Sequence, residues 1–243
     1  MILADTRHSL TRDDAQLVAR LIARDSGDDL ARVERALADE GIDTVLDDPQ
    51  LPAALLHRRQ GACASLPLFA YVMVRHALRR LGEQDRVVAD YLASLLLHFG
   101  IRDRALRVGA SDDQTYSTLA DLAGDLDDPD GRRSFLVRTH LGNYALWMSG
   151  LFPDRIEHRR WRKGGPDLDY YEEMGRRGFQ LAAEHRLAGD HGLARFYAIA
   201  AERFGLLRAA LNEVSDALLF PNHHSPDRLM RQVSNEARWR RVN

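Results

Sequence analysis

The sequence is poor in cysteine, in lysine and in long apolar runs. Its one cysteine, Cys63, excludes an internal disulfide and a cysteine-based zinc site, which fits a reducing compartment. The longest apolar stretches, such as residues 66–74, are far shorter than the roughly 20 residues that a membrane-spanning helix needs. The first residues lack the apolar core of a signal peptide. We therefore expect a soluble cytoplasmic protein without a membrane partner.

The charge balance argues against a general binder of polyanions. The 34 basic and 36 acidic residues leave a net charge of −2, whereas nucleic-acid binding needs a basic surface that releases counterions. Lys163 is the only lysine, and the preference for arginine is typical of a GC-rich bacterial genome. A nucleic-acid partner is therefore not expected, although the basic end of the chain, with Trp239, leaves that possibility open.

Hydrophobic residues recur with helical spacing along the chain, and no segment alternates as a strand does. Thr11 and Asp14 suit a capping box, and Ser65 with Pro67 suits the start of an apolar helix. Residues 192–219 carry apolar side chains every three or four positions, which predicts one long helix. The pattern predicts an all-α protein, a single multi-helix bundle of about eight to ten helices with no sheet.

Changes in composition predict three parts. Residues 1–60 hold thin amphipathic stripes and twelve acidic residues in the first fifty, so we expect an acidic helical appendage. Residues 65–222 form the expected helical core, in which Gly142 and Gly150 would let neighbouring helices approach closely. Residues 223–243 form a basic C-terminal tail that is either a docked helix or disordered.

Three histidines lie inside strongly apolar helical segments: His76, His98 and His140. A buried imidazole needs partners for its ring nitrogens, so each either makes a structural hydrogen bond or belongs to a site. Helical bundles build sites from inward-facing side chains, and a pocket lined by these histidines with Asn143 and Tyr144 is the alternative catalytic hypothesis. No helical metal motif is present, so no metal is predicted and the cofactor is unknown. The pair Asp154 and His158 is better explained by a solvated, salt-bridged face.

A ligand site is also conceivable in residues 138–173, because a Gly-Gly turn beside basic residues at a helix start can hold an anion on its backbone N–H groups. The candidate residues place polar, basic and aromatic groups near that turn: Arg138, Tyr144, Trp147, Arg162, Lys163, Gly164, Gly165 and Tyr170.

No nucleophile elbow, phosphate loop or dinucleotide fingerprint occurs. The leading hypothesis is therefore a non-enzymatic protein-association or regulatory module with a protein partner or a homo-oligomeric state. The alternative is a small-molecule- or metal-binding enzyme that uses the histidine pocket.

Overall fold

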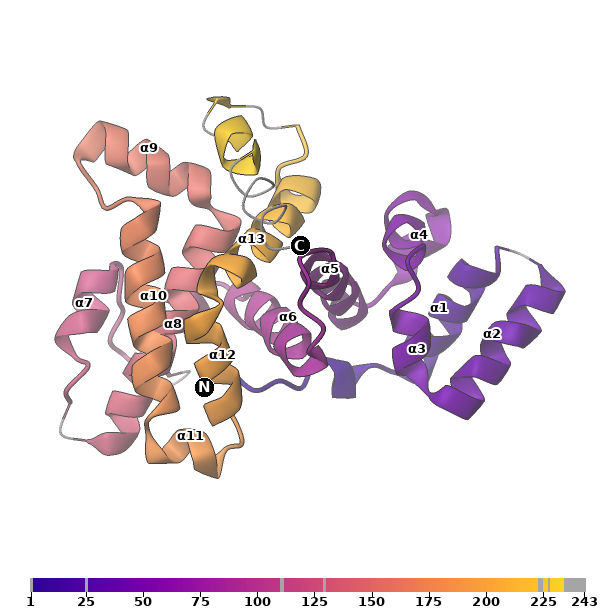
Figure 1. Ribbon diagram of the computed structural model, residues 1–243, viewed down its shortest axis with the longest axis horizontal. Helices are drawn as coiled ribbons and strands as arrows, with labels where there is room; N and C mark the ends of the chain where they lie inside the picture. Colours follow the sequence, from indigo (N-terminus) through magenta and orange to yellow (C-terminus); the bar gives the residue numbers. More distant parts are fainter. Residues whose placement is uncertain are drawn as a thin grey trace. The chain divides into compact units, whose positions relative to one another are not determined.

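The computed structural model describes residues 2–24, 26–109, 112–128, 130–222, 225–226 and 228–233. The described residues are helical with no strand, which confirms the all-α class (Figure 1). None of their helices is both long enough and apolar enough to cross a membrane. The chain forms two compact units, Ile2–Leu97 and His98–Asn243, so the expected single bundle is matched only loosely. The division into residues 1–60, 65–222 and 223–243 stays a prediction.

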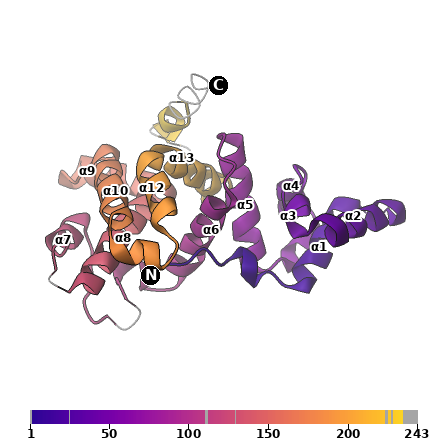
Figure 2. The ribbon, with the colours of Figure 1, turned by 60° about the horizontal axis from the view of Figure 1, so that its bottom comes forward.

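The described part of the first unit contains two 3-10 turns and six α-helices, the last of which, α6, continues into the second unit. In chain order they are η1 (Arg7–Ser9), α1 (Arg12–Ala23), α2 (Gly27–Glu40), α3 (Ile42–Leu46), α4 (Leu51–His57), η2 (Arg59–Cys63), α5 (Leu66–Arg80) and α6 (Arg86–Gly100). The expected caps are present: Thr11 and Asp14 form a capping box on α1, and the Ser65 side chain accepts from the Leu68 N–H on α5. Figures 1 and 2 show α5 and α6 as neighbours.

The second unit is built around α8, the longest helix. Its elements after α6 are η3 (Arg104–Leu106), α7 (Leu119–Gly124), α8 (Gly131–Leu151), α9 (Pro153–Lys163), α10 (Leu168–Ala183), α11 (Arg186–Asp190), α12 (Ala194–Glu202), α13 (Phe204–Val214) and the π-helical η4 (Ser215–Leu219). Helices α7, α9, α10 and α13 all contact α8. Nearly every position of α8 from Phe135 to Leu151 is buried, as its apolar circumference predicts.

Glycines bring the helices around α8 together. A Cβ built on Gly178 of α10 would lie 2.6 Å from the backbone nitrogen of Gly142, and one on Gly150 would lie 2.7 Å from Leu211 of α13. Such distances leave no room for a side chain. The expected close approach at Gly142 and Gly150 is confirmed.

The expected continuous helix over residues 192–219 is wrong, because it breaks at Arg203 into α12 and α13. The guanidinium of Arg176 donates to the carbonyls of Ala201 and Glu202, at 3.0 and 2.9 Å, and so satisfies groups at the end of α12. The ring of Phe204 occupies the space beside Gly175, where a Cβ would lie 2.2 Å from it. Tertiary contacts therefore override a regular sequence period.

Candidate functional site: a C-terminal surface of the second unit

His76 lies in α5 and is bound within the first unit. Its Nε2 is 3.0 Å from the carbonyl oxygen of Leu46, the last residue of α3, and its side chain is buried. Burial lowers the pKa of His76, and its hydrogen bond to Leu46 opposes that shift without cancelling it. A neutral ring that donates to a carbonyl at a helix end performs a structural role.

His140 lies in α8 and is bound in the same way within the second unit. Its Nε2 donates to the carbonyl oxygen of Ala105 at 3.0 Å, and its ring lies 5.3 Å from that of Phe99 and 6.2 Å from that of Tyr144. Burial lowers the pKa of His140 to about 3, so the ring is neutral at physiological pH. This geometry explains His140 as a link between α8 and η3.

His98 and Asn143 are two further residues of the predicted pocket. The ring of His98 lies 6.3 Å from that of Phe99 in the second unit, and Asn143 is buried in α8. His76 and His140 each donate to a separate backbone carbonyl of their own unit. The contacts therefore give structural roles to two of the three histidines, and a shared three-histidine pocket stays a prediction.

The Gly-Gly turn does not offer its backbone N–H groups to an anion. Gly164 ends α9 with a φ of 62°, and the N–H groups of Gly164 and Gly165 donate to the carbonyls of Arg160 and Arg159 at 3.0 and 3.4 Å. Asp167 caps the next helix by accepting from the Tyr170 N–H. These hydrogen bonds already occupy both amides, so they give no support to anion binding by the backbone of this turn. Arg162 and Lys163 are exposed side chains, and a ligand site around them stays a prediction.

The other predicted ligand residues belong to the packing of α8. Arg138 donates to the carbonyl of Leu126 at 3.2 Å, and the Tyr144 hydroxyl donates to the carbonyl of Ser117 at 3.4 Å. Trp147 packs edge-on against Phe152, with ring centroids 4.8 Å apart. These contacts explain the polar and aromatic side chains of α8 without a ligand.

The spacing of Asp154 and His158 on α9 suggested a solvated, salt-bridged face, and Asp154 has a basic partner from outside α9. Asp154 lies 3.7 Å from Arg231. Within the described ranges, no group of three or more metal-ligating side chains could hold an ion.

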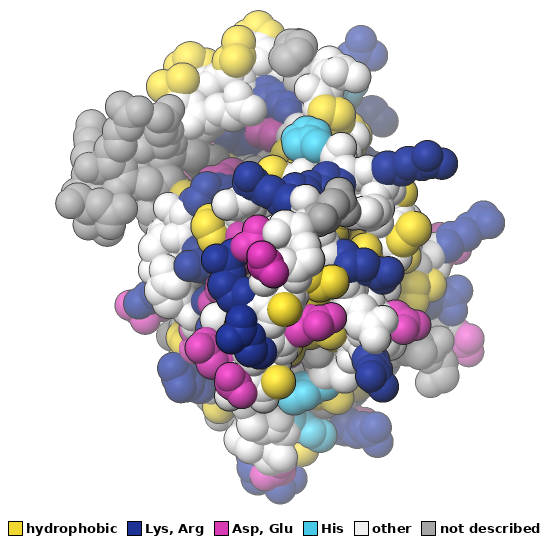
Figure 3. All heavy atoms as spheres, turned by 90° about the vertical axis from the view of Figure 1, so that its right-hand side faces the viewer, with side chains coloured by type: hydrophobic (Ala, Val, Ile, Leu, Met, Phe, Trp, Pro, Cys, Tyr) yellow, Lys and Arg dark blue, Asp and Glu magenta, His cyan; other side chains and the backbone are white. Residues whose placement is uncertain are grey.

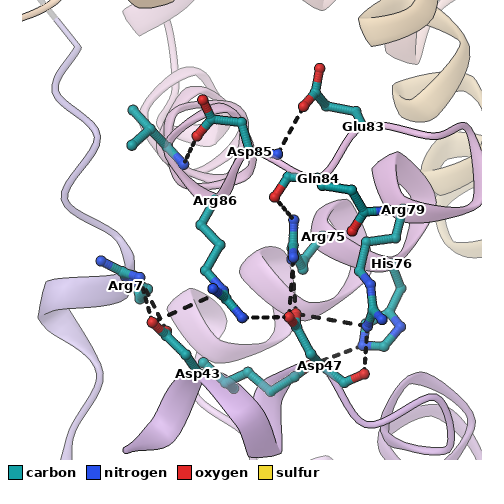
Figure 4. A network of polar contacts seen from close by, with 12 residues as sticks. Arg7, Asp43, Asp47, Arg75, His76, Arg79, Glu83, Gln84, Asp85 and Arg86 are labelled. Carbon is teal, nitrogen blue, oxygen red and sulfur yellow. Dashed lines mark hydrogen bonds and ion pairs between the residues drawn. The ribbon is translucent and has the colours of Figure 1, made fainter.

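Polar side chains in the first unit gather around Asp47 (Figure 4). Its carboxylate accepts from Arg75 at 2.8 and 3.1 Å and from Arg86 at 2.8 Å, while Arg79 donates to its backbone carbonyl. Burial alone would raise the pKa of Asp47, but Arg75 and Arg86 outweigh it and lower the pKa below its usual range. Three arginines occupy this carboxylate and its backbone, so the cluster fastens α3 to α5 and α6.

An open cavity of about 480 Å³ lies between α10 and α12, and its lining includes Ala183, Ala198 and Ala201. Arg176 lines it and also pairs with Glu172 at 2.7 Å besides donating to two carbonyls. The guanidinium of Arg176 therefore already has protein partners, and we assign no ligand to this cavity.

The end of the second unit exposes large apolar side chains on two segments that lie against each other. Their exposed fractions run from 40% to 67%, and the residues are Leu219, Phe220, Leu229, Met230 and Val233. We call these five residues the C-terminal apolar cluster. Residues 228–233 are helical, so Leu229 and Val233 lie one turn apart on the same side. Single exposed apolar residues are ordinary, whereas a contiguous group marks an interaction surface.

Ion pairs fix the segment that carries this cluster. The Asp216 carboxylate lies 3.2 Å from Arg228 and 3.1 Å from Arg231, and Gln232 donates to it at 2.8 Å. Arg228 also donates to the backbone carbonyls of Asp216 and Phe220, at 2.8 and 2.6 Å. Residues 228–233 are therefore docked on residues 216–220. This part of the predicted basic tail is a docked helix. Residues 234–243, with Trp239, lie outside the described residues.

Helix α9 adjoins the apolar cluster and carries a row of basic side chains. Arg231 lies between Asp216 and Asp154 of α9, and the ring of Phe152, just before α9, packs on that of Phe220 at 6.2 Å. Most of α9 is exposed, and Trp161 has an exposed fraction of 75%.

Sequence reasoning did not single out this surface. The residues at 219, 220, 229, 230 and 233 belong to two segments, and only the tertiary ion pairs of Asp216 bring those segments together. The available signal was the presence of Leu229, Met230 and Val233 in the first half of the basic tail.

Comparisons of the chain with protein families, with curated proteins and with solved structures found no match.

Proposed function

We propose that this protein acts as a protein-association module and that the C-terminal apolar cluster is its contact surface. The observation that carries the proposal is the exposure of five large apolar side chains on two segments that Asp216, Arg228 and Arg231 hold together. Burying apolar surface contributes about 25 cal/mol for each Å² removed from water, so covering this cluster would stabilise a complex.

Rigidity supports the same proposal. Association costs free energy when loops and side chains must be ordered at the interface. The hydrogen bonds from Arg228 to two backbone carbonyls already order residues 216–220 and 228–233. A surface ordered before binding loses less conformational entropy on binding.

The test is the molar mass in solution, measured by light scattering, together with crosslinking in cells followed by reconstitution with any purified partner. We expect either a dimer or a discrete heteromeric complex, and the double variant Leu229→Glu, Met230→Glu should lose it. The matched control is Leu66→Glu, Val87→Glu, which changes two exposed apolar residues of the first unit, with exposed fractions of 74% and 52%.

A monomeric wild type with no reconstituted complex would overturn the proposal. Equal loss in the control variant would also overturn it, since the effect would not belong to the cluster.

The enzyme alternative, with its intra-bundle pocket of His76, His98, His140, Asn143 and Tyr144, has less support. The hydrogen bonds of His76 and His140 to backbone carbonyls give both rings structural roles. Metal content and thermal-shift screening of the purified protein would test it.

A further inference from the structure

We infer that the basic row on α9 is a second contact for the same partner, and that it recognises an acidic helical segment. This inference rests on the proposed function, since it assigns a chemistry to the partner that covers the apolar cluster. The row comprises Arg155, His158, Arg159 and Arg162, and we call it the α9 row.

The α9 row lies along one side of the helix. Its members are spaced i, i+3, i+4 and i+7, the spacing that aligns side chains on an α-helix. Ile156 and Pro153 are buried, whereas all four residues of the row are exposed, so the row faces solvent.

No carboxylate neutralises the row within the described part of the chain. Arg155, Arg159 and Arg162 form no ion pair there, whereas Arg160 lies near Glu157 and Asp167, at 3.8 and 4.0 Å. Other arginines of this unit are paired, as Arg133 is with Asp112 at 3.2 Å. A row of unneutralised cations attracts an anionic partner.

Trp161 offers the partner an apolar contact on the same helix as the α9 row. Its indole is 75% exposed, and the guanidinium of Arg160 lies 5.9 Å from its ring centroid. Tryptophan and arginine are the residues most enriched at the energetic centres of interfaces. The partner segment should therefore combine carboxylates with an apolar side chain.

The short extent of the α9 row favours a short acidic protein segment over a nucleic acid as its partner. Acidic residues flank it at both ends: Asp154 precedes it on α9, and Asp167 and Asp169 follow it at the start of α10. The whole chain has a net charge of −2. Basic and acidic side chains are also intermixed on another face, the right-hand side of Figure 1, which Figure 3 draws. A phosphate backbone that continued past the row would meet those carboxylates, whereas a helix with a few glutamates would not.

The α9 row and the apolar cluster can serve one partner. Asp154 at the start of α9 contacts Arg231, which lies in the segment that bears the cluster. A partner that covers the cluster therefore lies beside the first residue of the row.

The test uses a synthetic helical peptide with glutamates spaced i, i+3 and i+7 and one leucine. We expect salt-sensitive binding, and a blue shift of tryptophan fluorescence that Trp161→Phe removes, since an exposed indole becomes covered. The triple variant Arg155→Gln, Arg159→Gln, Arg162→Gln should weaken binding roughly tenfold, because three exposed ion pairs are lost. The matched control is Arg12→Gln, Arg20→Gln, Arg35→Gln on α1 and α2, which removes the same charge from exposed arginines and should leave binding unchanged.

The outcomes separate this inference from the proposed function. Failure of the peptide to bind, equal binding of its glutamine version, or tighter binding of a thymidine oligonucleotide would overturn the acidic-segment inference. The proposed function would stand in each case if the complex is still lost in Leu229→Glu, Met230→Glu. If that complex does not exist, the proposed function fails regardless of the peptide result.

Discussion

The two units hold their helices together by different means. In the first unit, Asp47 ties α3 to α5 and α6 through arginines, and Arg75 is almost fully buried. In the second, glycines and aromatic rings set the distances, as where Gly178 lies against Gly142 and Phe204 fills the space beside Gly175. We therefore expect the stability of the first unit to depend most on its buried ion pair, and that of the second unit to depend most on the small size of its buried glycines.

The largest effect is expected for Asp47→Ala. Removing this carboxylate leaves the buried guanidinium of Arg75 without its ion-pair partner, which costs about 3–5 kcal/mol of the free energy of unfolding. Chemical denaturation would measure it. Asp43→Ala is the control: its pair with Arg7 is more exposed, so it should cost only about 0–1 kcal/mol. Equal losses in the two variants would show that burial of the pair does not matter.

The next effect is expected for Gly178→Ala. The new Cβ would lie 2.6 Å from the nitrogen of Gly142 and 3.0 Å from the carbonyl oxygen of Arg138, and backbone atoms cannot turn aside as a side chain can. We expect a loss of about 1–3 kcal/mol in stability. Gly100→Ala meets no atom within 4 Å and should be neutral or stabilising by up to about 1 kcal/mol. A tolerated Gly178→Ala would contradict the close packing of α8 and α10.

A graded effect is expected from pH, and it is small just below pH 6.5. The pKa of His140 is about 3 in the folded protein, below the ordinary value of 6.5, so between these values the unfolded chain binds a proton that the folded chain does not. The free energy of unfolding should therefore fall progressively as the pH decreases below about 6.5. Burial also lowers the pKa of His76, so His76 should likewise make the first unit less stable as the pH falls.

The measurement that isolates His140 is the slope of unfolding free energy against pH in His140→Gln, whose amide can still donate to Ala105. The slope between pH 5 and 6.5 should be shallower than in the wild type. An unchanged slope would mean that His140 titrates normally.

The sequence predicted what depends on nearby residues. The Thr11 capping box and the Ser65 cap involve groups within three residues, and the helical period needs only one face. Gly142 and Gly150 were recognisable because small residues in an apolar helix have few other uses.

It could not predict what depends on distant residues. The partners of His76 and His140 are 30 and 35 positions away in the chain, so three apolar-helix histidines suggested a pocket where two have structural bonds. The N–H groups of Gly164 and Gly165 can either cap a helix or bind an anion. The sequence alone does not show which of the two they do, because the choice depends on the backbone conformation of the turn. The break at Arg203 likewise depends on Arg176 and Gly175 of another helix.

The most direct test of the central claim is photo-crosslinking in cells from a photoreactive residue in place of Met230, compared with the same residue in place of Val87. We expect a discrete protein adduct at position 230 that Leu229→Glu abolishes, and no such adduct at position 87. Adducts equally strong at both positions, or none at position 230, would contradict the claim.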